Sequence, residues 1–342
     1  NNLESSLKVI PKEDGSFEVL MPDGSKSLYT FKNGTVSKVS DVMEKITPIS
    51  KNVESVKVDT ITLAMILCGG LIVAFMLVDD FFGLRASLRI IFQAAIVLFM
   101  ILISEEYITN LGNLYGNGDV NLGAIAIPFT IFCVVGLMNA YNMIDGLNGI
   151  CASFGLVPLI FLTFFGSVKY GLLIPIGAIL GFMAYNLGYL GKKRRVFLGD
   201  SGSNYIGFTV AFLCITYSQD SQIINPVTAL WLVAIPLLDC LGVIVSRVKK
   251  GLMPFTPGRD HLHHKLLDKG YSPKNILYIF ILISIVLCSV GCLLEFFFPN
   301  DDYISLGLFI LFAILYYAMT RSSIDWNKEL KTKIKIKMES NV

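Results

Sequence analysis

The chain has 342 residues, of which 54% are hydrophobic and only 16% are charged, and its mean hydropathy is +0.65. This composition excludes an ordinary water-soluble domain and indicates a protein of the lipid bilayer. The formal net charge is only +2, which excludes the strongly basic surface typical of a protein that binds nucleic acid. The seven cysteines lie within or beside apolar runs without a Cys-x-x-Cys pair, so they are interpreted as small hydrophobic residues.

Residues 1–57 are polar and differ from the rest of the chain. Turn signals at 22–24 (Pro-Asp-Gly) and 33–34 (Asn-Gly) separate short alternating runs at 17–20 and 28–31. Alternating runs joined by tight turns are typical of β-hairpins. We therefore expect this segment to form one or two small hairpins outside the membrane.

From residue 58 onward, apolar stretches alternate with polar connections. Most stretches approach the roughly 20 residues that a helix needs to cross the hydrocarbon core. The nine stretches lie at 59–78, 87–104, 122–140, 150–166, 170–190, 203–217, 226–246, 276–298 and 303–320. The sequence thus predicts an all-α, polytopic membrane domain at 58–320 with about nine transmembrane helices, followed by a basic tail at 321–342.

Lysine and arginine are concentrated on one alternating set of connections, near 85–89, 192–195 and 247–274, and in the tail. The opposite connections carry only Lys169. The positive-inside rule therefore places the basic connections and the tail in the cytoplasm, and residues 1–57 outside it. A polar segment without a signal peptide is not expected to cross a membrane unaided, so we also expect a membrane segment upstream of this sequence.

Four polar clusters fall on the predicted cytoplasmic side. The first is the pair Asp79 and Asp80, at the end of the first apolar stretch. Adjacent carboxylates at a membrane edge repel each other and lose hydration, which favours a role beside a cation or in proton transfer. Arg85 and Arg89 follow within about two helical turns and are suited to holding an anion. A helix end made soluble by acids is the alternative interpretation.

The second cluster places polar residues at every third position, Asn139, Asn142 and Asp145, with Asn148 after them. This spacing brings the side chains near one helical face, and the glycines at 146 and 149 allow a turn or a close approach of a ligand. Three amides and an acid are costly in an apolar segment, which favours a functional role. Helix capping and turn formation are the alternative.

The third cluster is Gly-Asp-Ser-Gly at 199–202, directly after the basic run at 192–195. Asp200 in this context suits a metal carboxylate on a tight turn, and backbone N–H groups at the start of the next helix suit a phosphate. An ordinary surface turn is the alternative.

The fourth cluster contains every histidine of the protein, His261, His263 and His264, between Arg259 and Lys265. Such a cluster could bind zinc. No cysteine accompanies it, however, and the neighbouring cations favour an anion such as a diphosphate.

Together these clusters indicate phosphoryl transfer. Oxygen ligands from Asp and Asn suit Mg²⁺ or Mn²⁺ bound partly through substrate phosphates, and His, Arg and Lys suit a diphosphate. An acceptor within reach of the bilayer is most readily a lipid phosphate. A membrane transporter is the alternative, but its acids would lie near the bilayer midplane, whereas here only Asp239 falls well inside a span.

The motifs resemble those of the polyprenyl-phosphate N-acetylhexosamine-1-phosphate transferases. LVDDFFGLRASLR, NAYNMIDGLNGI, FLGDSGSNYIGFT and RDHLHH occur in that family's order between about residues 59 and 320. The stretch NPVTALWLVAIPLLD and the His-x-His-His form are most similar to the bacterial undecaprenyl-phosphate GlcNAc-1-phosphate transferase branch, which primes O-antigen, common antigen or teichoic acid synthesis. The phospho-N-acetylmuramoyl-pentapeptide transferase branch, which usually carries three consecutive histidines, is the alternative.

The resemblance implies that a UDP-N-acetylhexosamine, most simply UDP-GlcNAc, reacts with undecaprenyl phosphate at the cytoplasmic face of the inner membrane to release UMP. It implies Mg²⁺ or Mn²⁺ as cofactor and leaves a homodimer open. By this resemblance the metal ligands are Asp200 and Asn142, the catalytic residues are Asp79, Asp80 and Asp145, and the substrate-binding residues are Arg89, Asn139, Asn148, Arg259, His261, His263 and His264. Asp79 and Asp80 would orient or deprotonate the lipid phosphate, which Arg89 would hold.

The sequence departs from the family in three places. Gly83 stands where many relatives have a third acid, so any role of that acid is absent here. Asn148 replaces a frequent Asp, which is expected to alter sugar or nucleotide contacts. The family normally has two further helices before residue 59, which would account for the external position of residues 1–57.

Overall fold

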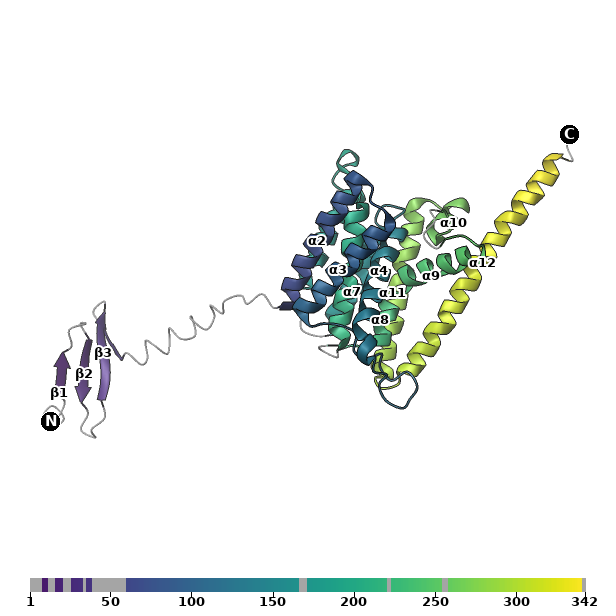
Figure 1. Cartoon of the computed structure of the whole chain (residues 1–342). Helices are drawn as coiled ribbons and strands as arrows, with labels where there is room; N and C mark the ends of the chain where they lie inside the picture. Colours follow the sequence, from purple (N-terminus) through teal and green to yellow (C-terminus); the bar gives the residue numbers. More distant parts are fainter. Residues whose placement is uncertain are drawn as a thin grey trace. The chain divides into compact units, whose positions relative to one another are not determined.

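The computed structural model describes residues 8–11, 16–20, 26–32, 35–38, 60–165, 171–219, 223–253 and 258–339. The chain divides into two compact units, Asn1–Val58 and Asp59–Val342. The labels used below are those of Figure 1.

The first unit contains a four-stranded antiparallel sheet in the order β1-β2-β3-β4. Its strands are β1 Lys8–Pro11, β2 Ser16–Leu20, β3 Lys26–Lys32 and β4 Thr35–Lys38. The register pairs Phe17 with Tyr29 and Phe31 with Val36. The expected hairpins are therefore present and extend into one continuous meander, although the two turn signals at 22–24 and 33–34 lie outside the described residues.

The second unit is helical, which confirms the all-α class of the membrane domain. Its helices are α2 Thr60–Phe82, α3 Ala86–Ser104, α4 Ala126–Ile144, α5 Ile150–Leu162, α6 Leu173–Asn186, α7 Gly199–Gln219, α8 Pro226–Leu232, α9 Ala234–Lys249, α10 Leu262–Asp268, α11 Pro273–Phe297 and α12 Asp302–Glu339.

Each of the nine predicted stretches contains helix, but a count of nine spans is not confirmed. Within the described residues, five helices are long and apolar enough to cross a membrane, namely α2, α3, α4 with its short preceding turn, α11, and α12 up to Thr320. A sixth candidate is the α8 and α9 pair, which bends by 79° between Leu232 and Ala234. α5 and α6 are shorter than a full span. The chain is thus a multi-pass membrane protein in which several crossings are short or broken.

α7 explains why one predicted crossing is less apolar than the others. It packs against α2, α4, α5 and α8, and almost every residue from Ser203 to Ser218 is buried (Figure 1). A helix enclosed by other helices need not present apolar side chains to lipid, so it tolerates Ser203, Asn204 and Thr209 in its buried length.

A glycine permits the close contact between α4 and α7. A Cβ atom at Gly207 would lie 2.8 Å from the Cα of Met138 and 3.1 Å from the Cβ of Tyr141. We expect Gly207→Ala to destabilise the protein by about 1–3 kcal/mol, because the backbone of α4 would have to shift. Thermal unfolding of the purified protein measures this effect.

The matched control is Gly136→Ala, on the exposed side of α4, where a Cβ meets nothing within 4 Å. It is expected to leave the unfolding temperature unchanged or slightly raised, because alanine has the better helix propensity. Equal losses in the two variants would contradict the close-contact explanation.

Candidate active site

Arg89 joins the first and third polar clusters. Its guanidinium Nη1 lies 3.2 Å from Asp79 Oδ2 and 3.3 Å from Asp200 Oδ2. Asp79 is buried in the last turn of α2 and also accepts a hydrogen bond from the backbone N–H of Leu84 at 2.7 Å. Asp200 is in the first turn of α7 and is 41% exposed, so an incoming ligand can reach it. Asp80 is exposed beside this group.

A chain of hydrogen-bonded amides lies next to this ion pair, and two of its members, Gln93 and Asn204, are buried. Asn139 Nδ2 donates to Gln93 Oε1 at 2.9 Å, and Gln93 Nε2 donates to Asn204 Oδ1 at 2.7 Å. Asn204 Nδ2 then donates to the backbone carbonyl of Asp200 at 2.8 Å. Each buried amide in this chain has a partner, as burial in an apolar bundle requires.

Gln93 is a residue of the site that sequence reasoning missed. It is 2% exposed, and it follows Arg89 by four positions on α3, so the two side chains lie on the same helical face. An isolated amide inside an apolar stretch, one helical turn from a motif arginine, was the signal that could have identified it.

Asn142 is linked to α7 through a serine. Its Nδ2 donates to Ser203 Oγ at 3.1 Å, and the Ser203 hydroxyl lies within hydrogen-bond distance of the backbone carbonyls of Gly199 and Asp200. The amide nitrogen of Asn142 is therefore engaged, and its amide oxygen is the atom suited to a cation. The second and third clusters thus lie side by side.

Asp145 follows the last residue of α4 and is partly buried. Burial, and secondly the negative charge of Asp200, raise the pKa of its carboxyl to about 6. Asn148 lies in the same turn and is half-buried, and Gly149 at φ +81° begins α5. The turn between α4 and α5 therefore holds an acid that is partly protonated near neutral pH.

The raised pKa of Asp145 predicts a stability effect in the metal-free protein. Because the folded pKa of about 6 exceeds the ordinary value of 3.8, the stability due to protonated Asp145 is complete below about pH 4 and is lost as the pH rises through 6. Asp145→Asn is expected to unfold a few degrees above the wild type at neutral pH and at the same temperature as the wild type near pH 4.

Thermal unfolding at both pH values measures this difference. The control is Asp119→Asn, an exposed acid in the connection between α3 and α4. A gain for Asp145→Asn that is the same at both pH values would show that the carboxyl charge is not its cause.

The histidine cluster contacts the turn between α4 and α5. A Cβ atom at Gly146 would overlap the imidazole of His263, so the absence of a side chain at this position allows the contact. His263 is 1% exposed, and within the described part of the chain neither of its ring nitrogens has a hydrogen-bond partner. Burial, followed by the neighbouring His264, lowers the pKa of His263 to about 4. Burial and the charge of Arg259 lower that of His264.

Asp239 holds the first histidine in place. His261 Nδ1 lies 2.7 Å from Asp239 Oδ2, and the backbone N–H of Leu262 donates to Asp239 Oδ1 at 3.0 Å. Tyr316 Oη from α12 donates to the same oxygen at 2.9 Å. Asp239 and His261 are 4% and 5% exposed, so this buried group fixes the start of α10 against α9 and α12.

Two of the predicted residues lie at the margin of the site. Arg259 is 68% exposed on its side chain and pairs with Asp268 at 3.3 Å, on the outer side of the connection that contains α10. Asp80 makes no ion pair within the described residues. The segment 254–257, which ends with Pro257 just before Gly258 and Arg259, lies outside the described residues.

The donor set fits a divalent cation that is completed by substrate. Within the described ranges, no group of three His, Cys, Asp or Glu side chains is placed to hold a metal ion by itself. Asp200 and the amide oxygen of Asn142 are hard oxygen donors on adjacent helices. Mg²⁺ is commonly held by one or two such groups together with substrate phosphates and water.

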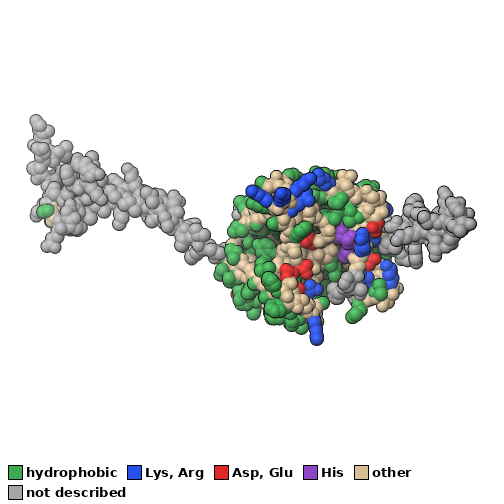
Figure 2. Space-filling model, turned by 90° about the horizontal axis from the view of Figure 1, so that it is seen from above, with side chains coloured by type: hydrophobic (Ala, Val, Ile, Leu, Met, Phe, Trp, Pro, Cys, Tyr) green, Lys and Arg blue, Asp and Glu red, His purple; other side chains and the backbone are tan. Residues whose placement is uncertain are grey.

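All four clusters lie at one end of the helical unit. Figure 2 views this end and shows acidic side chains, histidines, lysines and arginines gathered on it, with hydrophobic side chains along much of the rim. The face can therefore bring a multivalent anion to a membrane edge.

Comparisons with known proteins cover most of the helical unit. The family model described as glycosyl transferase family 4 matches residues 62–218. The undecaprenyl-phosphate alpha-N-acetylglucosaminyl 1-phosphate transferase of Escherichia coli K12 is 35% identical over 264 residues, covering 75% of this chain and 72% of that protein. The proteins of the same name from Yersinia pestis and Haemophilus influenzae are each 33% identical, covering 75% and 77% of this chain and 72% and 77% of their own lengths.

Proposed function

Because the chain belongs to glycosyl transferase family 4 and is a sugar-phosphate transferase of the membrane, we propose that it transfers GlcNAc-1-phosphate from UDP-GlcNAc to undecaprenyl phosphate. The products are UMP and a lipid-linked diphosphate sugar that starts a cell-envelope glycan. The observation that carries the proposal is Arg89 between Asp79 and Asp200, an ion pair that brings the ends of α2, α3 and α7 to one point at the membrane edge.

The proposed reaction is a displacement at phosphorus. An oxygen of the lipid phosphate attacks the β-phosphorus of the nucleotide sugar, a new P–O bond forms, and the bond to the UMP oxygen breaks. UMP leaves with the electron pair as an anion. A lipid phosphate is already ionised near neutral pH, so positioning and charge neutralisation are the main requirements.

The carboxylates and Arg89 position the acceptor. Arg89 lies within reach of both carboxylates, and its five N–H donors can also bind a phosphate in a forked geometry. Asp79 keeps the arginine oriented, and Asp80, next to it in the chain, is exposed and accessible to an incoming phosphate. Both residues orient the acceptor or accept its proton.

Asp200 and Asn142 hold the divalent cation, Mg²⁺ or Mn²⁺, and this cation supplies neutralisation of the diphosphate charge. Asp145 and Asn148 shape the nucleotide-sugar pocket from the turn between α4 and α5. Asn139 supports the site through Gln93.

The histidine cluster binds the diphosphate. His263 lies against Gly146 and carries unpaired ring nitrogens within the described region, and His264 contacts it at a ring-centroid distance of 4.2 Å. His261 is held by Asp239, and Arg259 adds positive charge from the outer side. The basic connections support a position of this face on the cytoplasmic side of a bacterial inner membrane.

The deciding experiment supplies undecaprenyl phosphate and radiolabelled UDP-GlcNAc to the purified full-length protein. We expect UMP release and a labelled lipid that depend on Mg²⁺ or Mn²⁺ and are abolished by a chelator. UDP-GalNAc and UDP-MurNAc-pentapeptide are the matched donors that test the sugar. Absence of product with every UDP-N-acetylhexosamine, while lipid and metal still bind, would refute the function.

A further inference from the structure

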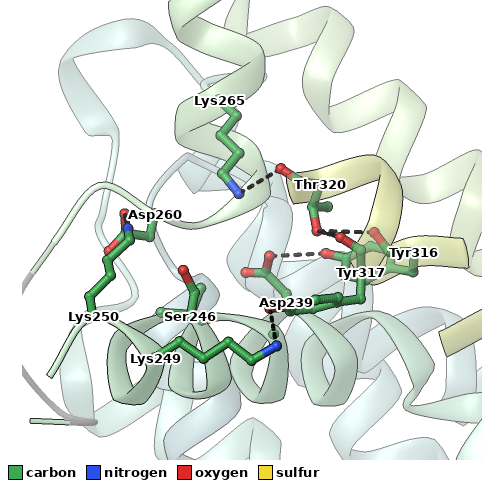
Figure 3. Close-up of a pocket in the computed structure, with 11 residues that line it drawn as sticks. Asp239, Ser246, Lys249, Lys250, Asp260, Lys265, Tyr316, Tyr317 and Thr320 are labelled. Carbon is green, nitrogen blue, oxygen red and sulfur yellow. Dashed lines mark hydrogen bonds and ion pairs between the residues drawn. The ribbon is translucent and has the colours of Figure 1, made fainter. Parts of the chain in front are cut away.

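A polar cavity lies next to the histidine cluster, between α9, α10 and α12. Its volume is about 240 Å³. Figure 3 shows Ser246 and Lys249 of α9 at this cavity, with Lys250 directly after α9, Lys265 of α10, and Tyr316, Tyr317 and Thr320 of α12. It shares Asp239 and Tyr316 with the group that holds His261, and Lys249 has no assigned role in the transfer reaction.

The two acids of this cavity already have partners. Asp260 lies 3.5 Å from Arg247 Nε and 3.9 Å from Lys250 Nζ. Asp239 is engaged by His261, Tyr316 and the Leu262 backbone. Both carboxylates still act on Lys265 as negative charges, but among the described residues neither forms an ion pair with Lys249 or Lys265.

Two lysines that line the cavity, Lys249 and Lys265, form no ion pair with a carboxylate among the described residues. Lys249 Nζ donates to Tyr317 Oη at 3.3 Å, and Lys265 Nζ donates to the backbone carbonyl of Thr320 at 3.3 Å (Figure 3). Burial lowers the pKa of Lys265. Two ammonium groups and a tyrosine hydroxyl around a partly open cavity form a site for an anion that carries several acceptor oxygens.

The place of the cavity in the fold indicates the source of that anion. Thr320 is the last residue of the apolar span of α12, and Lys249 is the last residue of α9. The cavity is thus at the membrane edge, where phospholipid phosphates lie and where basic pockets between helices bind anionic headgroups.

We propose that this cavity binds the phosphate group of an anionic phospholipid, separately from the transfer site. Lys249 and Lys265 contact the phosphate oxygens, and the Tyr317 hydroxyl orients the Lys249 ammonium. The bound headgroup ties α9 and α10 to α12 and so supports the wall that also holds His261 through Asp239.

The test is native mass spectrometry of the purified full-length chain with equal amounts of phosphatidylglycerol and phosphatidylcholine of the same acyl chains. The wild type is expected to retain phosphatidylglycerol about tenfold more than phosphatidylcholine. The double substitution Lys249→Gln and Lys265→Gln is expected to lose most of this preference. Tyr317→Phe keeps both charges and is expected to lose a smaller part.

Lys269→Gln is the matched control, because Lys269 is exposed at the end of α10, outside the cavity. A wild type without preference, or an equal loss in Lys269→Gln, would overturn the proposal. So would displacement of phosphatidylglycerol by undecaprenyl phosphate, or by inorganic phosphate at equal ionic strength, since each would identify another occupant. A wild type that lacks the preference but still releases UMP would refute this site and leave the proposed function intact.

Discussion

Asp200→Ala is expected to lower the rate of sugar-phosphate transfer by about 100-fold or more, the usual scale of lost electrostatic stabilisation. The substitution removes a proposed metal ligand and one of the two carboxylates that hold Arg89, which remains paired with Asp79 at 3.2 Å. The concentration of Mg²⁺ needed for half-maximal rate is expected to rise as well. UMP release at several Mg²⁺ concentrations measures both effects.

Asp79→Asn is the companion variant, with an expected loss of similar size. It leaves the metal ligands in place, so its Mg²⁺ requirement should stay near that of the wild type while the requirement for undecaprenyl phosphate rises. Asp119→Ala, which removes an exposed acid from the connection between α3 and α4, controls for the change in net charge. Near-normal rates for Asp200→Ala or Asp79→Asn would refute the assigned roles.

The sequence predicted that four separated polar clusters lie on one side of the membrane, and the structure places all four at one end of the bundle. A common end follows from the alternation of helix direction, which apolar stretches and basic connections encode locally, and the side of the membrane stays a prediction. The helical membrane class and the sugar-phosphate transferase family were confirmed, because both depend on contiguous sequence. Apolar stretches predict the class, and motifs predict the family.

The pairings inside the site were not predictable in the same way. Gln93 and Asn204 are 111 residues apart, and their hydrogen bond exists only because α3 packs beside α7. The contact of His263 with Gly146 likewise depends on where α10 lies, which no local pattern determines. The number of membrane spans could not be predicted from local patterns, because it depends on tertiary features. α7 is shielded by other helices, and the α8–α9 pair is bent.

Asp239 is a residue whose importance the fold makes clear, and Asp239→Asn is expected to lower the transfer rate by up to about 100-fold. The asparagine is nearly isosteric, but it replaces the carboxylate that faces His261 Nδ1 at 2.7 Å and the Leu262 N–H at 3.0 Å. The imidazole then loses the acceptor that fixes its tautomer and orientation, and a displacement of about 1 Å in a positioned group can cost this much.

Asp239 is a positioning residue, because it acts through His261, and its test must separate positioning from folding. Asp239→Asn should raise the KM for the nucleotide sugar and lower kcat, while the KM for undecaprenyl phosphate stays near the wild-type value. Asp239→Glu, which keeps the charge, should recover part of the rate. Tyr316→Phe removes one hydrogen bond to Asp239 and leaves the carboxylate, so its loss should be smaller. If Asp239→Asn instead lowers the unfolding temperature strongly and changes both KM values together, the residue supports the fold and not the orientation of His261.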